Sequence, residues 1–109
     1  MNKVVIAGNL TKDPEFKQTA SGVPMCTMVV AVNRPHNAGG DKDVDFFDVI
    51  AWRGQAESSY KHLKKGSKVC VSGYIQKRTV EGADGNKRFY VEIVADDVEF
   101  LTAQRSEQL

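Results

Sequence analysis

The hydrophobic residues of this chain recur mostly at every second position, which is the period of β-strands because their side chains alternate between two faces. Three such runs come first, at Lys3–Leu10, Val23–Val32 and Asp45–Trp52. Turn-forming residues separate them: "TKDPE" follows the first run, and "NRPHNAGGDKD" follows the second and predicts a long loop. The first half of the chain therefore predicts three strands.

One helix is predicted after these strands, because the period of the hydrophobic residues changes. Ala56, Tyr60 and Leu63 recur at helical spacing in "GQAESSYKHLKKG", and Tyr60 is expected to pack the helix against the core. Gly66 is placed to end the helix, since Gly readily adopts the left-handed conformation found at helix C-termini.

A β-hairpin is predicted next. Two alternating segments, about Lys68–Val80 and Lys87–Ala95, flank the turn-rich stretch "EGADGN", and a short apolar piece, "VEFL", follows. At roughly 3.3 Å per residue, arms of about a dozen residues are longer than a small barrel. We therefore expect the tip of the hairpin to project from the domain.

Three strands, a helix and a hairpin are the element order of an OB-fold. We predict an all-β OB-fold: a five-stranded Greek-key barrel with one helix between its third and fourth strands and a long projecting hairpin. The 109 residues suffice for one core, so we assign residues 1–102 to this domain and 103–109 to a short polar C-terminal end.

Some residues are expected to serve the packing of the barrel. Met25 and Met28 are expected to fill the core. Gly8 and Gly73 interrupt strand-like runs, and are better explained by close approach of two backbones than by ligand binding.

Composition excludes several classes of function. Cys26 and Cys70 lie inside strand-like runs, as expected for two reduced thiols of a cytoplasmic protein. Neither His36 nor His62 has a Cys or carboxylate at ligand spacing, so no metal or cofactor is expected. No catalytic triad motif is present, so we do not predict an enzyme. The first apolar run is too short for a signal peptide or membrane span.

The formal charge of +1 conceals an uneven distribution. Residues 1–60 carry six basic and seven acidic side chains (−1), 61–88 carry eight and two (+6), and 89–109 carry one and five (−4). Four lysines of the basic segment are expected to be a solvated helix end: Lys61, Lys64, Lys65 and Lys68. The other four charges gather on the hairpin and suit an anionic partner: Lys77, Arg78, Lys87 and Arg88.

The stretch "DFFDVIAW" predicts exposed aromatic rings. Its alternation places Phe46, Asp48, Ile50 and Trp52 on one face. A carboxylate is seldom buried without a partner, so this face is expected to be the wetter one. Exposed rings can stack on bases of a single strand, each worth roughly 1–3 kcal/mol. Alternatively, the rings cover the core or an oligomer interface, and spacing alone does not separate these interpretations.

Five motifs, in this order and spacing, resemble the bacterial single-stranded DNA-binding protein family: "NKVVIAGNLTKDPE", "VNRP", "DFFDVIAWRGQAE", "LKKGSKVCVSGYIQ" and "DGNKRFYVEIVADDVEFL". The resemblance runs from Asn2 to about Leu101. It implies an OB-fold, usually a homotetramer, that coats single-stranded DNA in replication, repair and recombination with little sequence preference. It also implies a cytoplasmic, nucleoid-associated protein.

The resemblance also implies site residues. Phe46 and Trp52 stand where the family keeps stacking aromatics, and His36 stands where several relatives have a stacking Trp. Val80 replaces an aromatic of some members, and Asp48 lies on the binding face, so weaker or less extended wrapping is expected. Lys3, Lys17, Arg78 and Arg88 match basic positions of the family. With Arg34 and Lys77 added for their charge, the predicted phosphate contacts are Lys3, Lys17, Arg34, Lys77, Arg78 and Arg88.

Members of the family typically end in a long disordered tail with an acidic tip that recruits partner enzymes. This sequence stops at "QRSEQL", where Glu107 is the only acidic residue after Glu99. Recruitment of replication or repair proteins through such a tail is therefore not expected. The alternative function is an OB-fold protein-interaction module, a replication-restart or conjugation accessory with weak nucleic-acid binding. RNA is a further candidate ligand, because stacking and phosphate contacts do not distinguish the two polymers well.

Overall fold

The computed structural model describes residues 1–35 and 43–101. It has one helix and six strands in these ranges, in the chain order β1, β2, β3, β4, α1, β5, β6. Their bounds are β1 Val4–Leu10, β2 Glu15–Gln18, β3 Pro24–Asn33, β4 Val44–Trp52, α1 Arg53–His62, β5 Lys68–Glu81 and β6 Lys87–Phe100.

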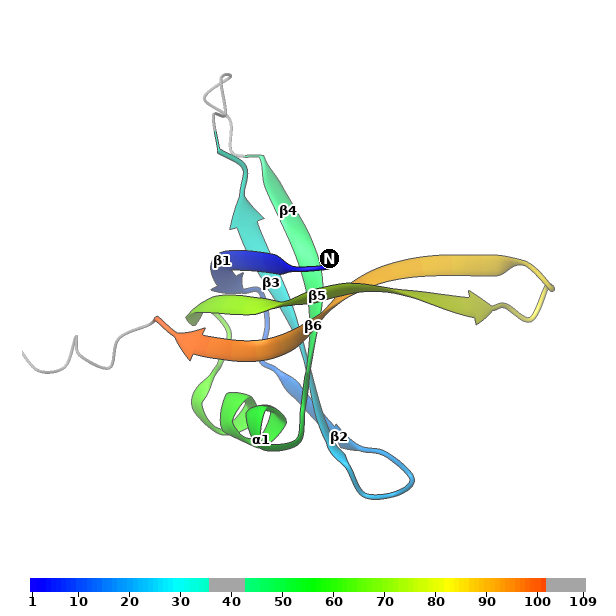
Figure 1. The fold of residues 1–109 in the computed structure, drawn as a ribbon, viewed down its shortest axis with the longest axis horizontal. Coiled ribbons are helices and arrows are strands. Elements are labelled where there is room, and N and C mark those ends of the chain that lie inside the picture. Colours follow the sequence, from blue (N-terminus) through cyan, green and yellow to red (C-terminus); the bar gives the residue numbers. More distant parts are fainter. Residues whose placement is uncertain (36–42, 102–109) are drawn as a thin grey trace, which may run out of the picture.

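The strands form one sheet that closes on itself (Figure 1). The order of neighbours is β1-β5-β6-β4-β3-β2, and an additional pairing between β1 and β3 completes a ring of five strands. Asn9 and Leu10 make this closing contact opposite Ala31 and Val30. The pairing of β4 with β6 is parallel, and the others are antiparallel. This is the predicted OB-fold barrel, with α1 between its third and fourth strands.

Inward-facing residues at alternate positions fill the barrel. On β4, Val49 and Ala51 are fully buried, and on β3 the same holds for Cys26, Met28 and Val30. Burial raises the pKa of the Cys26 thiol to about 11, so it remains neutral and packs as a small apolar side chain. Cys26 and Cys70 are both free thiols.

The segment after β1 forms a strand that the sequence analysis missed. Glu15–Gln18 pairs with the start of β3 and makes β2, where we predicted only a turn. Its Phe16 packs against the ring of Tyr60 with 5.2 Å between centroids. Four residues are too few to display a clear alternation, so pairing with β3 rather than local pattern defines this strand.

The helix begins where it was predicted but ends earlier than expected. Arg53 has a left-handed φ of 58°, which turns the chain from β4 into α1 directly after Trp52. The helix ends at His62, before Gly66. Tyr60 was expected to be the packing residue, but it is 51% exposed. The buried helical residues are Ala56 and Ser59. Ala56 and Leu63, the residue after the helix, are buried as predicted, so among the three periodic residues only Tyr60 lies mostly outside the core, where its ring packs on Phe16.

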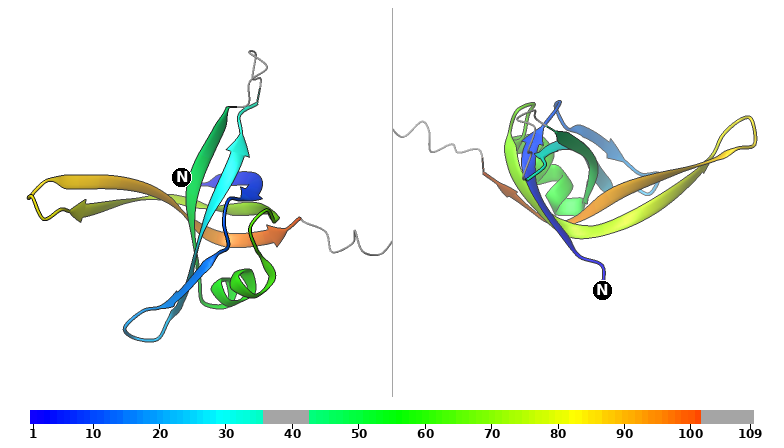
Figure 2. Two further views of the ribbon diagram at one scale, coloured as in Figure 1. Left: turned by 180° about the vertical axis from the view of Figure 1, so that it is seen from behind. Right: turned by 90° about the horizontal axis from the view of Figure 1, so that it is seen from above.

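The β5–β6 hairpin extends far outside the barrel, as predicted (Figure 2). Its second arm continues to Phe100, so the first three residues of "VEFL" are part of β6 and do not form a separate segment. Ile75, although in alternation with buried Val71, is 45% exposed because the arm has left the barrel there. No helix in the described ranges is long and apolar enough to cross a membrane.

Two contacts hold the hairpin where it leaves the barrel. The side-chain amide of Asn2 donates to the carbonyl of Ile75 and accepts from its N–H, at 2.7 and 2.9 Å.

The pairing of β5 with β6 shifts by one residue between Ser72 and Gly73, which marks a bulge. A Cβ on Gly73 would overlap the backbone of β6, and one on Gly8 would overlap that of β3. The expected role of both glycines in close backbone approach is thus confirmed.

Candidate nucleic-acid interface

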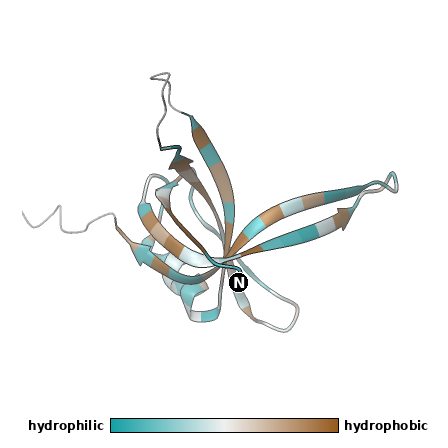
Figure 3. Ribbon diagram, turned by 45° about the horizontal axis from the view of Figure 1, so that its top comes forward, coloured by the Kyte–Doolittle hydropathy of each residue, from teal (hydrophilic) through white to brown (hydrophobic). Residues whose placement is uncertain are grey.

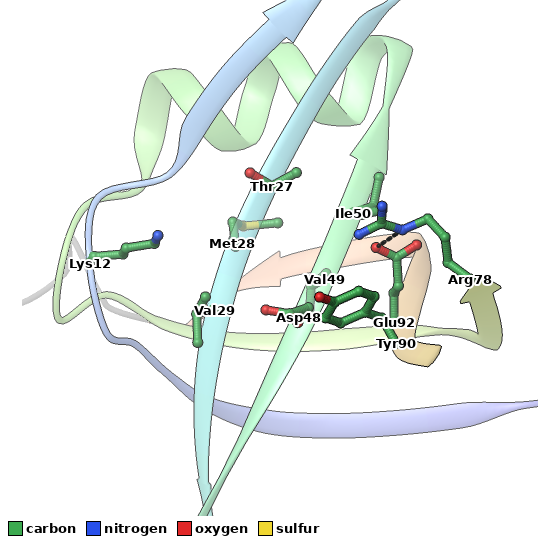
Figure 4. Close-up of a pocket in the computed structure, with 10 residues that line it drawn as sticks. All are labelled: Lys12, Thr27, Met28, Val29, Asp48, Val49, Ile50, Arg78, Tyr90 and Glu92. Atoms are coloured by element: carbon green, nitrogen blue, oxygen red, sulfur yellow. Dashed lines mark hydrogen bonds and ion pairs between the residues drawn. The ribbon is translucent and has the colours of Figure 1, made fainter. Parts of the chain in front are cut away.

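A groove lies on the outer face of the barrel, between β3, β4 and the base of the hairpin (Figure 4). It consists of two adjoining hollows of about 250 and 330 Å³. Four side chains line both hollows: Thr27, Ile50, Arg78 and Glu92. We refer to the two hollows together as the groove. Outward-facing positions alternate with core positions along each strand, so the strands that build the core also form the floor of the groove.

The predicted aromatic residues lie on this outer face. Phe46 is 65% and Trp52 36% exposed, whereas Val49 and Ala51 between them face the core. The prediction that Asp48 shares the wetter face is confirmed. Trp52 follows Phe46 by six positions, which corresponds to about 20 Å along an extended strand. The strand therefore displays two ring faces at the spacing of several nucleotides.

Trp52 lines one end of the groove together with Lys17 and Met25. Met25 pairs with Trp52 across the β3–β4 ladder, so it does not fill the core as expected. The physical reason is the period of two, which places Met25 on the face opposite Cys26 and Met28. The Trp52 ring thus stands beside an apolar floor and a lysine, which is the combination that holds a stacked base and its phosphate.

Consecutive basic residues of the hairpin point to opposite faces. Arg78 lines the groove, and Arg88 lies on the same face because it alternates with Tyr90, the partner of Arg78. Lys77 faces the other way and places its ammonium 4.6 Å from the ring centre of Phe89. The sequence analysis grouped Lys77 with Arg78 by their charge, but the two side chains lie on opposite faces of the hairpin.

Two further predicted contacts, Lys3 and Arg34, lie outside the groove. Lys3 is exposed directly before β1. Arg34 donates two hydrogen bonds to Asp45, at 3.0 and 2.9 Å. These bonds hold the pKa of the Asp45 carboxyl below its usual value and raise that of Arg34. Part of the positive charge of Arg34 is therefore already compensated. His36 lies outside the described residues.

Glu92 is a groove residue that the sequence analysis did not identify. It is only 5% exposed, and its Oε2 accepts a hydrogen bond from Nε of Arg78 at 3.3 Å. The Arg78 guanidinium also lies 5.4 Å from the ring centre of Tyr90. Alternation from Tyr90 places Glu92 on the outer face, but its burial follows from the packing of the hairpin against β4.

Residues 1–35 and 43–101 contain no group of three or more His, Cys, Asp or Glu side chains that could hold an ion. The chemistry available in the groove is stacking on rings, attraction of phosphates by basic side chains, and hydrogen bonding at the floor.

Comparison with known proteins agrees with this description. The sequence profile of the Single-strand binding protein family matches residues 1–101. Single-stranded DNA-binding protein 3 of Listeria innocua is 45% identical over 107 residues, which cover 97% of this chain and 67% of that protein. The single-stranded DNA-binding protein of Clostridium tetani is 45% identical over 102 residues, covering 93% and 70%. Single-stranded DNA-binding protein 1 of Staphylococcus aureus is 41% identical over 109 residues, covering 99% and 65%. The chain thus spans about two thirds of the length of these relatives, and it belongs to the single-strand binding protein family.

Proposed function

We propose that this chain binds and coats single-stranded DNA without reading its sequence, during replication, repair or recombination. The observation that carries the proposal is the row of exposed rings on β4, Phe46 and Trp52, beside a groove with basic side chains. The relatives named above are single-stranded DNA-binding proteins, which supports DNA as the polymer.

Stacking explains why a single strand is preferred over a duplex. In a duplex the faces of the bases are covered by their neighbours, whereas a single strand can present them to Trp52 and Phe46. Phosphates on the same path would meet Lys17 beside Trp52, then Arg78 and Arg88 along the hairpin. None of these contacts distinguishes one base from another, so we expect the affinity to depend on phosphate contacts and stacking and not on the base sequence.

Two lysines make a matched test of the phosphate path: Lys17 on β2 lines the groove, and Lys77 lies on the hairpin face opposite it. We expect Lys17→Gln to weaken binding to oligo-dT and to reduce the slope of log affinity against log salt by about 0.7, the value for one phosphate contact on a single strand. Lys77→Gln removes the same charge from the opposite face, and we expect the slope to stay within about 0.2 of the wild-type value. Equal changes in both variants would contradict the proposed path.

We also propose that the chain forms a homotetramer. Three apolar side chains lie on the hairpin face opposite the groove, outside the barrel: Ile75, Phe89 and Val91 are 45%, 60% and 59% exposed. Figure 3 shows hydrophobic positions interspersed with hydrophilic ones along the projecting hairpin. Val5 on the outside of β1 is 61% exposed. A projecting arm with such a face is stabilised when a second copy covers it.

Light scattering on the purified protein tests this association. The wild type is expected to have a mass of about four chains, and Val91→Asp a lower mass, because a carboxylate would be buried at the contact. Thr79→Asp places the same charge farther along the same face and should reduce the mass less. A monomeric wild type at micromolar concentration would refute the proposal.

A protein-interaction module is the second candidate, because two carboxylates lie in the groove. Asp48 on β4 and Glu92 on β6 are neighbours in the pairing of these two parallel strands. They reduce the attraction of the groove for phosphates and would suit a basic peptide. Binding of oligo-dT at low salt separates the two candidates.

A further inference from the structure

The groove contains an exposed ring besides those of β4, namely Tyr90 on β6. Tyr90 lines the hollow of about 250 Å³, and it is the only aromatic ring among the described residues that do so. It is 41% exposed, which is comparable with Trp52 at 36%. Tyr90 pairs with Arg78 across the hairpin, and both lie on the face of the groove. The groove therefore presents an aromatic surface in each of its two hollows.

The surroundings of Tyr90 suit the uncharged base of a nucleotide better than its phosphate. Figure 4 shows the ring beside the carboxylates of Asp48 and Glu92, which line the same hollow and repel phosphates. Val49 and Ile50 add apolar atoms to the lining. Every base has a π-face, so a ring in such a hollow can stack on any of the four bases.

Arg78 offers a phosphate contact next to this ring. Its guanidinium lies 5.4 Å from the ring centre of Tyr90, and its Nε donates to Oε2 of Glu92 at 3.3 Å. These contacts hold the guanidinium in place, while the Arg78 side chain remains 53% exposed, so its terminal N–H groups can bind a phosphate. Arg78 lines both hollows, and Trp52 lines the second. Arg78 therefore connects the hollow of Tyr90 with that of Trp52.

We propose that Tyr90 is a third stacking ring, and that Arg78 binds a phosphate between the base on Tyr90 and the base on Trp52. This inference rests on the proposed function. The added contact does not depend on the identity of the base, because stacking accepts all four. It extends the path of the strand from β4 across the groove to the base of the hairpin.

Matched tyrosine variants test the stacking role. Tyr90→Leu removes the ring but keeps an apolar side chain, and we expect it to weaken oligo-dT binding about fivefold or more, the lower end of the range for one stacked base. Tyr90→Phe keeps the ring and should bind within about twofold of the wild type. Tyr60→Leu makes the same change on α1, outside the groove, and should also stay within about twofold.

An abasic oligonucleotide separates stacking from an indirect effect through Arg78. Such a strand has the phosphates of oligo-dT but no bases, so the measured quantity is the affinity for oligo-dT divided by that for the abasic strand. We expect Tyr90→Leu to lower this ratio about fivefold, whereas Arg78→Gln weakens both strands and leaves the ratio nearly unchanged. An equal loss for both strands in Tyr90→Leu would show that the ring only positions Arg78, and would refute the stacking role.

The outcomes distinguish the inference from the proposed function. If the wild type binds oligo-dT at low salt and Tyr90→Leu binds it equally well, the third ring is refuted and the coating function stands. If the wild type does not bind oligo-dT at low salt, the proposed function itself fails. Should Tyr90→Leu unfold, the wild type is photo-cross-linked to an oligonucleotide that contains 5-iododeoxyuridine. We then expect an adduct on Tyr90, and its absence would refute the inference.

Discussion

Replacing Gly73 by Ala is expected to destabilise the fold by about 3 kcal/mol or more. The new Cβ would overlap the carbonyl oxygen of Val94 and lie 2.9 Å from its carbonyl carbon and 3.0 Å from Cα of Ala95. These are backbone atoms of β6, so no side-chain rotation can relieve the overlap. The strands would have to separate at the bulge where the hairpin leaves the barrel.

Chemical denaturation with a matched glycine variant measures this effect. Gly54→Ala adds the same methyl group in α1, where nothing lies within 4 Å and the backbone is not left-handed. Its free energy of unfolding should stay within about 1 kcal/mol of the wild type, with a small gain expected from helix propensity. A Gly73→Ala variant that unfolds at the wild-type denaturant concentration would show that the close approach of β5 and β6 is not required.

Trp52→Ala is expected to weaken the binding of oligo-dT by roughly 1–3 kcal/mol, which is about fivefold to 150-fold in affinity. The ring is 36% exposed at the end of the groove, and it is the only aromatic ring among the described residues that line that hollow. Trp52→Phe keeps an aromatic face and should retain most of the affinity. Anisotropy of a labelled oligonucleotide measures both variants.

The control for this prediction is Tyr60→Ala. Tyr60 is an exposed ring on α1 that does not line the groove. Its removal should leave oligo-dT affinity within about twofold of the wild type, even if stability falls slightly through the lost contact with Phe16. If Tyr60→Ala weakens binding as much as Trp52→Ala does, the bases stack elsewhere than on the β4 rings.

Features encoded by local alternation could be predicted from the sequence. The five barrel strands, the outward Phe46 and Trp52, and the projecting hairpin follow from a period of two and from the length of the runs. Gly73 could be assigned to a close backbone contact because a strand interior otherwise disfavours glycine.

Features that depend on pairing between distant segments could not be predicted in the same way. Glu92 is buried where β6 pairs with β4 next to Asp48, and Arg34 is paired with Asp45 across the β3–β4 connection. β2 exists because β3 offers it a partner. Alternation along the strand would have predicted that Lys77 and Arg78 lie on opposite faces, but the sequence analysis grouped them by charge instead.

The most direct test of the proposed function is a titration of the purified protein with oligo-dT, followed by tryptophan fluorescence at low and high salt. Trp52 is the only tryptophan, so the signal reports one point on the proposed binding face. We expect strong quenching by single strands, little by duplex, and a weaker response as salt rises. Unchanged fluorescence, together with no shift in the anisotropy of the labelled oligonucleotide, would contradict the proposed function and favour the protein-interaction module.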